Sequence, residues 1–306
     1  MPDRVHLIAR AAVVAVTFVL VLTALGFRHF RSSATRLTDV PPSLAQAVLS
    51  RVPGLPKTPR SVIVIVEENQ SYEKILDDPD SASYIASLAK EGALFTRSYG
   101  VGHPSQPNYF ALFAGRVNLD GDSCPATTMP ADAPNLGAEL LTAHRTFRAY
   151  VEDLPSPGYP GCASGEYARK HAPWTQFANV PARDAVPFSY LRSYDALPDV
   201  AFIIPNLVHD MHSASVADGD AWLRQNVDPL VAWAKRHDAL VILTWDESES
   251  LVTNHIPTIF VGPMVRPGRY AEVVTHYRVL RTIEDLFGLP HAGHAAEAAP
   301  ITNVWR

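Results

Sequence analysis

The sequence predicts an α/β domain built on a largely parallel central sheet with helices on both faces. Short, nearly continuous apolar runs alternate along the chain with segments of helical character, which is the pattern of such a fold. The apolar runs are rich in β-branched and aromatic residues, as expected for strands buried on both faces. We find no internal repeat. One domain covering residues 60–306 therefore accounts for most of the 306-residue chain.

The predicted strands follow one another from the start of this domain. SVIVIV opens it, and TFRAYV, VAFIIP, ALVILTW and PTIFVG follow in chain order at residues 61–66, 146–151, 200–205, 239–245 and 257–262. Helices are predicted between and after these strands, at residues 81–91, 109–114, 136–143, 218–237 and 276–287.

Two long stretches, 118–134 and 155–188, are rich in Pro, Gly and small polar residues. Both are predicted to be loops, and long loops in a compact domain usually shape a site. We expect these two loops to determine substrate specificity.

The N-terminus differs from the rest of the chain. Residues 11–27 carry no charge and are flanked by arginines, which indicates a signal anchor or a signal peptide over residues 1–30. No A-x-A-like cleavage site follows, so an uncleaved anchor is favoured. Residues 31–59, rich in Ser, Thr and Pro, are predicted to be a stalk. We therefore expect a membrane-anchored protein with its catalytic domain outside the cytoplasm, or a secreted or periplasmic one.

Charge and cysteine content narrow the class of protein further. The chain has 31 acidic and 26 basic residues, a formal net charge of −5, which argues against nucleic acid as a partner. Its two cysteines, Cys124 and Cys162, suit one disulfide in an oxidising compartment. The alternative is that both are unpaired small hydrophobic residues. Their spacing does not favour a structural zinc site.

Acidic residues follow four of the predicted strands. Because parallel strands end at one edge of a sheet, these side chains are expected to converge there, where open α/β sheets bind ligands. Carboxylates gathered in this way repel one another unless a cation lies among them. The residues after the strands are Glu67-Glu68-Asn69, Glu152-Asp153, His209-Asp210 and Asp246-Glu247.

Ser105, in the segment GVGHPSQPNYFALFAG (100–115), lies between two prolines just before a predicted helix. Free N–H groups and the positive end of the helix dipole favour an anion or a serine alkoxide at that position. A helix-capping serine is the alternative. The segment lacks the G-x-S-x-G pattern of an α/β-hydrolase, so that class has no support.

Several motifs in this order resemble the phosphoesterase family of acid phosphatases and phospholipase-C-like enzymes, within the alkaline phosphatase superfamily. The resemblance covers about residues 60–306. It depends on VEENQSYEKI (66–75), GHPSQPNYFALFAG (102–115), YVEDLP (150–155), YARKHAPWTQF (167–177), PNLVHDMH…DGDAWL (205–223), TWDES (244–248) and NHIPTIFVGP (254–263).

The resemblance implies roles for particular residues. Ser105 matches the nucleophile, Glu68 and Asn69 match a metal-binding pair, and Asp246 and Glu247 match the acidic pair that completes the metal shell.

Residues in matching motifs whose roles are less defined include Asn108 and His212, expected in catalysis, and Asp210 and His255, expected at metal. Asn108 or Asn69 is expected to donate a hydrogen bond to the phosphoryl group. His212 or His255 would bind a second ion or protonate the leaving group. His103 and Asp220 also lie in such motifs, and Asp220 is equally explained as support for the first turn of a helix.

Two departures from the family pattern bear on the site. Family members commonly have His-Asn-Pro where this chain has His171-Ala172-Pro173. The superfamily's Asp-His pair is Asp246-Glu247 here, and an oxygen-rich shell favours Mg, Mn or Ca over Zn, without excluding zinc. The sequence leaves open whether the site holds one ion or two.

These observations predict a metal-dependent phosphoric ester hydrolase that cleaves small phosphate monoesters through a phosphoserine intermediate. A phosphodiesterase or phospholipase C acting on phospholipid head groups is the nearest alternative. A catalytically silent surface-binding domain is a third, although it predicts a missing nucleophile or ligand. The sequence does not indicate an oligomeric state.

Overall fold

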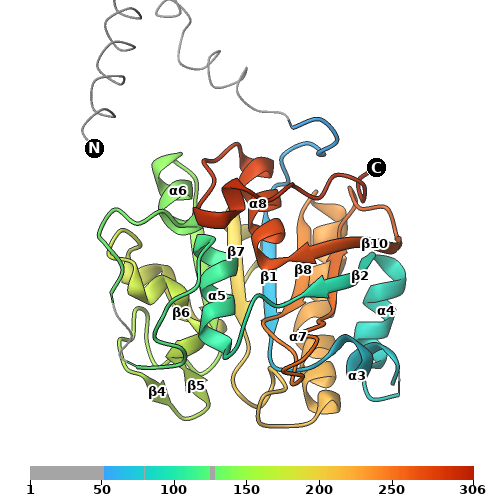
Figure 1. Cartoon of the computed structure of the whole chain (residues 1–306), viewed down its shortest axis with the longest axis horizontal. Helices are drawn as coiled ribbons and strands as arrows, with labels where there is room; N and C mark the ends of the chain where they lie inside the picture. The colour runs from blue at the N-terminus through green and yellow to red at the C-terminus, as the bar shows by residue number, and fades with distance from the viewer. Residues whose placement is uncertain (1–51, 79, 125–127) are drawn as a thin grey trace, which may run out of the picture. The chain divides into compact units, whose positions relative to one another are not determined.

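An eight-stranded sheet forms the centre of the computed structural model, which describes residues 52–78, 80–124 and 128–306. Its strand order is β10-β2-β9-β8-β1-β7-β3-β6 (Figure 1). The strands are β1 (Val62–Glu67), β2 (Ala93–Tyr99), β3 (Phe147–Val151), β6 (Ala185–Pro187), β7 (Val200–Ile204), β8 (Leu240–Trp245), β9 (Thr258–Val261) and β10 (Gly268–Thr275). Only β9 runs antiparallel to its neighbours, so the sheet is largely parallel, as predicted.

Helices cover both faces of the sheet. On one face α5, α6 and α8 pack with the strands into one apolar cluster, and on the other face α3, α4 and α7 pack into a second. Figure 1 shows α5 and α8 in front of the sheet, with α7 behind it. The helices are α3 (Tyr72–Leu76), α4 (Ser83–Glu91), α5 (Ser105–Ala114), α6 (Leu136–Thr142), α7 (Val216–Arg236) and α8 (His276–Phe287).

Strand β1 lies at the centre and explains why its sequence is apolar throughout. Val62, Val64 and Val66 belong to the first cluster, while Ile63 and Ile65 belong to the second. Side chains of a strand alternate between its faces, so a strand covered on both sides needs apolar residues at every position.

All five predicted strands and all five predicted helices are present, with ends shifted by a few residues. The strands β2 and β10 were not predicted because their sequences mix polar and apolar residues, and β10 is largely exposed. The strand β6 was not predicted because it is only three residues long and lies in a stretch rich in Pro and small residues. The prediction for residues 155–188 as a loop is only partly right. This stretch contains a hairpin of β4 (Ala163–Ser164) and β5 (Tyr167–Ala168), the strand β6 and several 3₁₀ turns, including η2 (Arg169–His171) and η3 (Pro173–Gln176).

Cys124 and Cys162 form a disulfide, as predicted, and it joins the two long loops. Met129 in the first loop also donates its N–H to the carbonyl of Gln176 in the second. The two predicted specificity loops are therefore tied to each other.

The predicted membrane anchor over residues 1–30 and most of the predicted stalk over 31–59 lie outside the described residues. From residue 52 the chain is described, and Leu55 packs against the first apolar cluster. No helix within the described part of the chain is both long and apolar enough to cross a bilayer.

Candidate active site

Ser105 is the first residue of α5, which begins four residues earlier than the sequence predicts. Strand β2 ends at the sheet edge where β1 and β8 also end, and the loop 100–104 carries the chain from there to Ser105. The serine is 2% exposed, and its Oγ donates to Glu68 Oε2 at 2.9 Å. Glu247 Oε1 lies 3.4 Å from the same Oγ. The hydroxyl therefore faces carboxylates from two neighbouring strands.

The loop 100–104 is held from inside by Asn108, one turn further along α5. Asn108 Oδ1 accepts from the N–H groups of Val101 and Gly102 at 2.8 and 3.2 Å. Its Nδ2 donates to the carbonyls of Gly102 and Pro104 at 2.9 and 3.2 Å. Backbone groups thus occupy the whole amide of Asn108, which positions the loop that leads to Ser105. Donation from Asn108 to the substrate stays a prediction.

Asn254 supports the same loop from the other side. Its Nδ2 donates to the carbonyl of Gly102, and its Oδ1 accepts from the N–H of Ser248. A Cβ at Gly100 would lie only 2.6 Å from Asn254 Nδ2, so this close approach requires glycine. Because β9 is antiparallel, the residues preceding it lie at the same edge as the ends of β1 and β8, which brings Asn254 to the site.

The predicted metal-binding carboxylates lie at the strand ends, as the topology requires. Glu68 follows β1, Asp246 and Glu247 follow β8, and Asp210 follows β7; all four are buried. Asp246 Oδ1 accepts from the backbone N–H of Asn69 at 3.1 Å. Asn69 has a φ of 48°, a left-handed conformation that asparagine tolerates better than most residues. The contact of Asn69 with Asp246 is thus made by its main chain.

The pKa values of these buried carboxylates are raised above the ordinary range of a carboxyl group. Burial, and then the charge of the neighbouring Glu247, raises the pKa of Asp246 to about 8. Burial, together with the charge of Glu68, raises the pKa of Glu247 to about 8. Burial and then Asp246 raise the pKa of Glu68 well above its usual range. The cluster therefore favours either bound protons or a bound cation.

Lys170 and Asp122 belong to the site although the sequence analysis did not select them. Lys170 Nζ lies 3.5 Å from Ser105 Oγ and 3.0 Å from Asp122 Oδ2. Burial lowers the pKa of Lys170, but Glu68, Asp122 and Asp246 outweigh it, so its pKa is above the usual range and the ammonium is charged. Asp122 also accepts from the N–H of Gln106. The sequence signal that could have identified Lys170 is its place in the YARKHAPWTQF motif.

His171 is a second residue that the sequence analysis placed in a motif but not in the site. It is 2% exposed and stacks on Tyr109, with ring centroids 4.9 Å apart. Nε2 lies 3.0 Å from Glu68 Oε1, and Nδ1 lies 3.4 Å from Asp210 Oδ2. Burial lowers the pKa of His171 to about 4, so the ring is neutral, and its Nε2 makes no hydrogen bond to a described residue.

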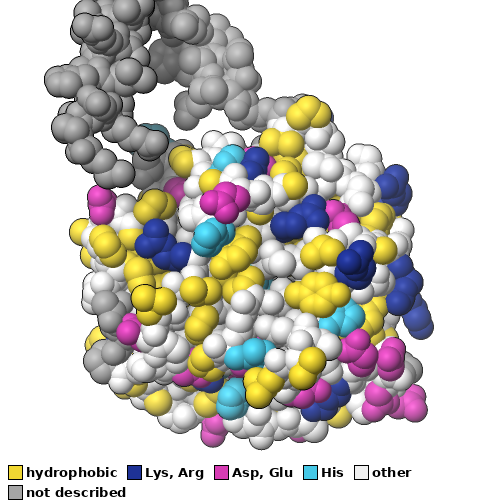
Figure 2. All heavy atoms as spheres, in the orientation of Figure 1, with side chains coloured by type: hydrophobic (Ala, Val, Ile, Leu, Met, Phe, Trp, Pro, Cys, Tyr) yellow, Lys and Arg dark blue, Asp and Glu magenta, His cyan; other side chains and the backbone are white. Residues whose placement is uncertain are grey.

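His103 and His276 flank the cluster. His103 Nδ1 lies 2.6 Å from Glu247 Oε2, and the side chain is 26% exposed at the mouth of the site. His276, the first residue of α8, is buried, and its Nε2 donates to the carbonyl of Asp246 at 2.6 Å. Burial lowers the pKa of His276 to about 4, so it positions Asp246 as a neutral ring. In Figure 2, which has the orientation of Figure 1, several histidine side chains reach the surface in the lower half of the domain.

Two predicted histidines differ from expectation. His255 does not join the carboxylate cluster, because Nδ1 lies 2.7 Å from Glu73 Oε1, Nε2 lies 3.2 Å from the Thr96 carbonyl, and the ring stacks on Tyr72. Both ring nitrogens of His255 therefore have partners outside the cluster, and the metal role expected of it stays a prediction. His212 is exposed. Its backbone N–H donates to Asp210 Oδ1 at 2.8 Å, and its ring Nδ1 lies 3.2 Å from Ser213 Oγ.

Asp220 and Glu152 also have structural partners. Asp220 accepts from the N–H groups of Tyr84 and Ile85 at the start of α4, which favours support of a helix over a role at metal. Glu152 accepts from the indole of Trp222 and contacts His209.

The donor set has the chemistry of a cation site. Asp246 Oδ2 and both oxygens of Glu67 are buried without a hydrogen-bond partner in the part of the chain that is described. As the side chains stand, no three His, Cys, Asp or Glu residues of that part are arranged to hold a metal ion. Oxygen donors are therefore available beside Ser105, and binding an ion requires some of these side chains to turn.

Comparisons with known proteins agree with this geometry. The model of the "Phosphoesterase family" matches residues 77–290. The chain is 46% identical to a phosphatidylinositol-3-phosphatase of Mycobacterium tuberculosis, over 80% of this chain and 82% of the relative. It is 29% identical to a phosphate-repressible acid phosphatase of Penicillium chrysogenum, over 86% of this chain and 69% of the relative.

Among solved structures, a Vibrio parahaemolyticus protein of the alkaline phosphatase superfamily matches with a TM-score of 0.57 at 12% identity. The match covers 84% of this chain and 78% of that one. At this identity the likeness concerns the fold alone.

Proposed function

The chain belongs to the phosphoesterase family and is a phosphoric ester hydrolase, and from this premise we propose that it cleaves phosphate monoesters with Ser105 as nucleophile. The observation that carries the proposal is the surroundings of one oxygen atom. Ser105 Oγ lies at a helix N-terminus, 2.9 Å from Glu68, 3.4 Å from Glu247 and 3.5 Å from Lys170. A base and a cation therefore reach the same hydroxyl.

The proposal includes a divalent cation held by oxygens of Glu68, Asp246 and Glu247. Its support is the burial of these carboxylates, their raised pKa values and the unpartnered Oδ2 of Asp246. When bound, such an ion lowers the pKa of a neighbouring hydroxyl and neutralises phosphoryl oxygens. The donor set is all oxygen, which favours Mg, Mn or Ca.

The residues of the chain divide the proton transfers and the charge between them. Glu68 accepts the proton of Ser105 Oγ as the Oγ–P bond forms and the bond from phosphorus to the leaving oxygen breaks. The ammonium of Lys170 offsets the negative charge that develops at Ser105 Oγ as its proton leaves. His103, at the mouth of the site, gives a proton to the leaving oxygen. Water then attacks phosphorus and gives a proton to His103, while the bond from phosphorus to Ser105 Oγ breaks and Glu68 returns its proton to that oxygen.

The monoester preference has its support in the names of the relatives, which are an acid phosphatase and a phosphatidylinositol-3-phosphatase. The second of these names also makes a lipid monoester a candidate substrate. A diesterase or phospholipase C activity at the same site is the competing proposal. Rates on a chromogenic monoester, the corresponding diester and phosphatidylcholine vesicles distinguish the two activities.

We also retain export from the cytoplasm as a proposal. The disulfide between Cys124 and Cys162 supports it, because disulfides persist in oxidising compartments. Anchoring by residues 1–30 is part of the same proposal. Fractionation of cells producing the full chain, with and without those residues, tests the anchor.

The decisive experiment is Ser105→Ala, with the exposed Ser213→Ala as matched control. Ser105→Ala is expected to abolish monoester hydrolysis while Mn²⁺ still binds to the carboxylates, and Ser213→Ala is expected to keep activity. Brief reaction of the wild type followed by acid quenching is expected to leave phosphate on the peptide containing Ser105. Near-normal turnover by Ser105→Ala would show that another group is the nucleophile.

A further inference from the structure

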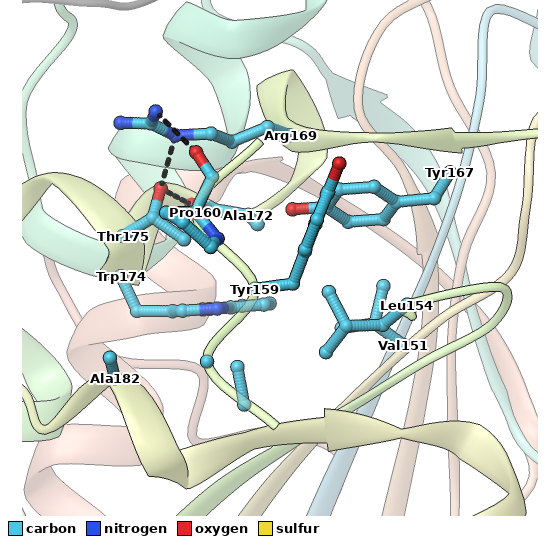
Figure 3. Close-up of a pocket in the computed structure, with 12 residues that line it drawn as sticks. Val151, Leu154, Tyr159, Pro160, Tyr167, Arg169, Ala172, Trp174, Thr175 and Ala182 are labelled. Carbon is cyan, nitrogen blue, oxygen red and sulfur yellow. Dashed lines mark hydrogen bonds between the residues drawn. The ribbon is translucent and has the colours of Figure 1, made fainter. Parts of the chain in front are cut away.

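A partly enclosed cavity of about 110 Å³ lies on the other side of the turn that carries Lys170 and His171. Its lining includes Leu154 after β3, Tyr159 in the loop, Ala172 and Trp174 (Figure 3). The lining is almost entirely apolar, with Arg169 at the edge. The cavity plays no part in the chemistry proposed for Ser105.

The turn η2 connects the cavity to the active site. In a 3₁₀ helix, residues three apart lie on the same face, and Arg169 and Ala172 accordingly both line the cavity. Lys170 and His171, between them, contact Ser105 and Glu68 instead. Material bound in the cavity therefore contacts the same turn that positions these two residues.

Two polar groups in this apolar lining have no partner. Tyr167 and Trp174 are 1% and 2% exposed, and Tyr167 Oη and Trp174 Nε1 make no hydrogen bond to any described residue. Figure 3 shows the hydroxyl end of Tyr167 pointing toward Pro160 and Ala172, across the cavity. A buried donor without an acceptor is unfavourable, so an occupant with an accepting oxygen would gain from the Tyr167 hydroxyl, which points across the cavity.

The rim of the cavity is organised rather than open. Arg169 Nε donates to Thr175 Oγ1 at 3.3 Å, and its Nη1 donates to the Pro160 carbonyl at 3.1 Å. These contacts tie η2 to η3 and to the loop that carries Tyr159. The side chain of Ala172 is a single methyl group, which leaves the cavity its space.

We propose that this cavity is a second binding site, which takes a small apolar ring or branched group bearing one accepting oxygen. An apolar cavity of about 150 Å³ accommodates benzene, so the smaller volume here limits the occupant to one small ring or branched group. The group is either the alcohol part of a phosphate ester or a separate small molecule. Only the first source depends on the proposed function.

The binding experiment uses cyclopentanone, with cyclopentane as the probe of equal shape that lacks the oxygen. Ligand-observed NMR on the full chain is expected to show cyclopentanone bound more tightly than cyclopentane. Tyr167→Phe is expected to weaken cyclopentanone about 2- to 10-fold and to leave cyclopentane unchanged. Ala172→Leu, which fills the cavity, is expected to abolish both. The exposed Tyr190→Phe and Ala217→Leu are the matched controls.

The two sources are separated by the KM for cyclopentyl phosphate and for ethyl phosphate. If the ester's alcohol part occupies the cavity, Ala172→Leu raises KM for cyclopentyl phosphate only, and cyclopentanone competes with that ester. If the occupant is a separate molecule, cyclopentanone binds without competing. Absence of cyclopentanone binding to the wild type, or binding unchanged in both cavity variants, overturns the proposal. Binding without hydrolysis of either ester would contradict the proposed function alone.

Discussion

Replacing Lys170 by methionine removes a charge from beside the proposed nucleophile while keeping most of the side-chain volume. Lys170 Nζ lies 3.5 Å from Ser105 Oγ. Two unit charges at this distance interact by about 5 kcal/mol at an effective dielectric constant of about 20. Only part of a charge develops at the oxygen and the lysine side chain is 18% exposed, so we expect about 3 to 4 kcal/mol of lost transition-state stabilisation.

This loss corresponds to a decrease of about 10²- to 10³-fold in kcat/KM, measured on a chromogenic phosphate monoester. Asp122→Asn, which keeps Lys170 but removes its ion-pair partner at 3.0 Å, is expected to cost about tenfold because the ammonium is then less firmly placed. The matched control is Lys235→Met, which removes a surface lysine paired with Glu91 and is expected to leave kcat/KM unchanged.

The reasoning would be refuted by a folded Lys170→Met enzyme whose kcat/KM stays within about threefold of the wild type. Circular dichroism and the Tm establish that the variant is folded. A rise in KM with kcat unchanged would also count against it, since that pattern means uniform binding of substrate and transition state.

Three further predictions concern the cation cluster, the nucleophile loop and the disulfide. The pKa values of Asp246 and Glu247 are both raised to about 8 in the folded protein. Between the ordinary carboxyl pKa and pH 8, the folded metal-free protein therefore holds protons that the unfolded chain has released, and the free energy of unfolding falls as pH rises through this range. Scanning calorimetry of metal-free protein should show Tm falling from pH 5 to pH 8 and Mn²⁺ raising Tm most at pH 8; a flat or rising Tm without metal contradicts it. Asn108→Ala should lower both Tm and kcat, the latter about tenfold, because it leaves backbone groups of the loop unpaired; lost activity at unchanged Tm would instead indicate substrate contact. Replacing Cys124 and Cys162 by serine opens a loop of sequence separation 38, worth about 4 kcal/mol, and should lower Tm by roughly 10 °C; a shift under about 2 °C would show that the loops are held by other contacts.

The convergence of the candidate site residues could be predicted from the sequence because it depends on topology. The apolar runs predicted largely parallel strands, and Glu68, Asp210 and Asp246, which follow three of them, lie at one edge of the sheet. Ser105 was found because its segment is local, with prolines and a helix start next to one another in the chain.

The contacts of Asn108 and His255 could not be predicted in this way. Both lie in the expected motifs, but which groups their side chains contact depends on neighbours distant in sequence. For His255 these neighbours are Glu73 and Thr96, which the antiparallel course of β9 brings within reach. A motif places a residue near a site, while the direction of its side chain depends on the local backbone and its packing.

By itself, then, the sequence determined the α/β class, the edge of the sheet that carries the site, the carboxylates gathered there and the serine that faces them. Only the tertiary structure showed that Lys170, His171 and Asp122 reach the same place and that a cavity lies behind their turn. Strand ends converge by a general rule of parallel sheets. Long loops such as 118–134 and 155–188 follow no such rule, because their course depends on the disulfide, the turns and the packing that tie them to the rest of the domain.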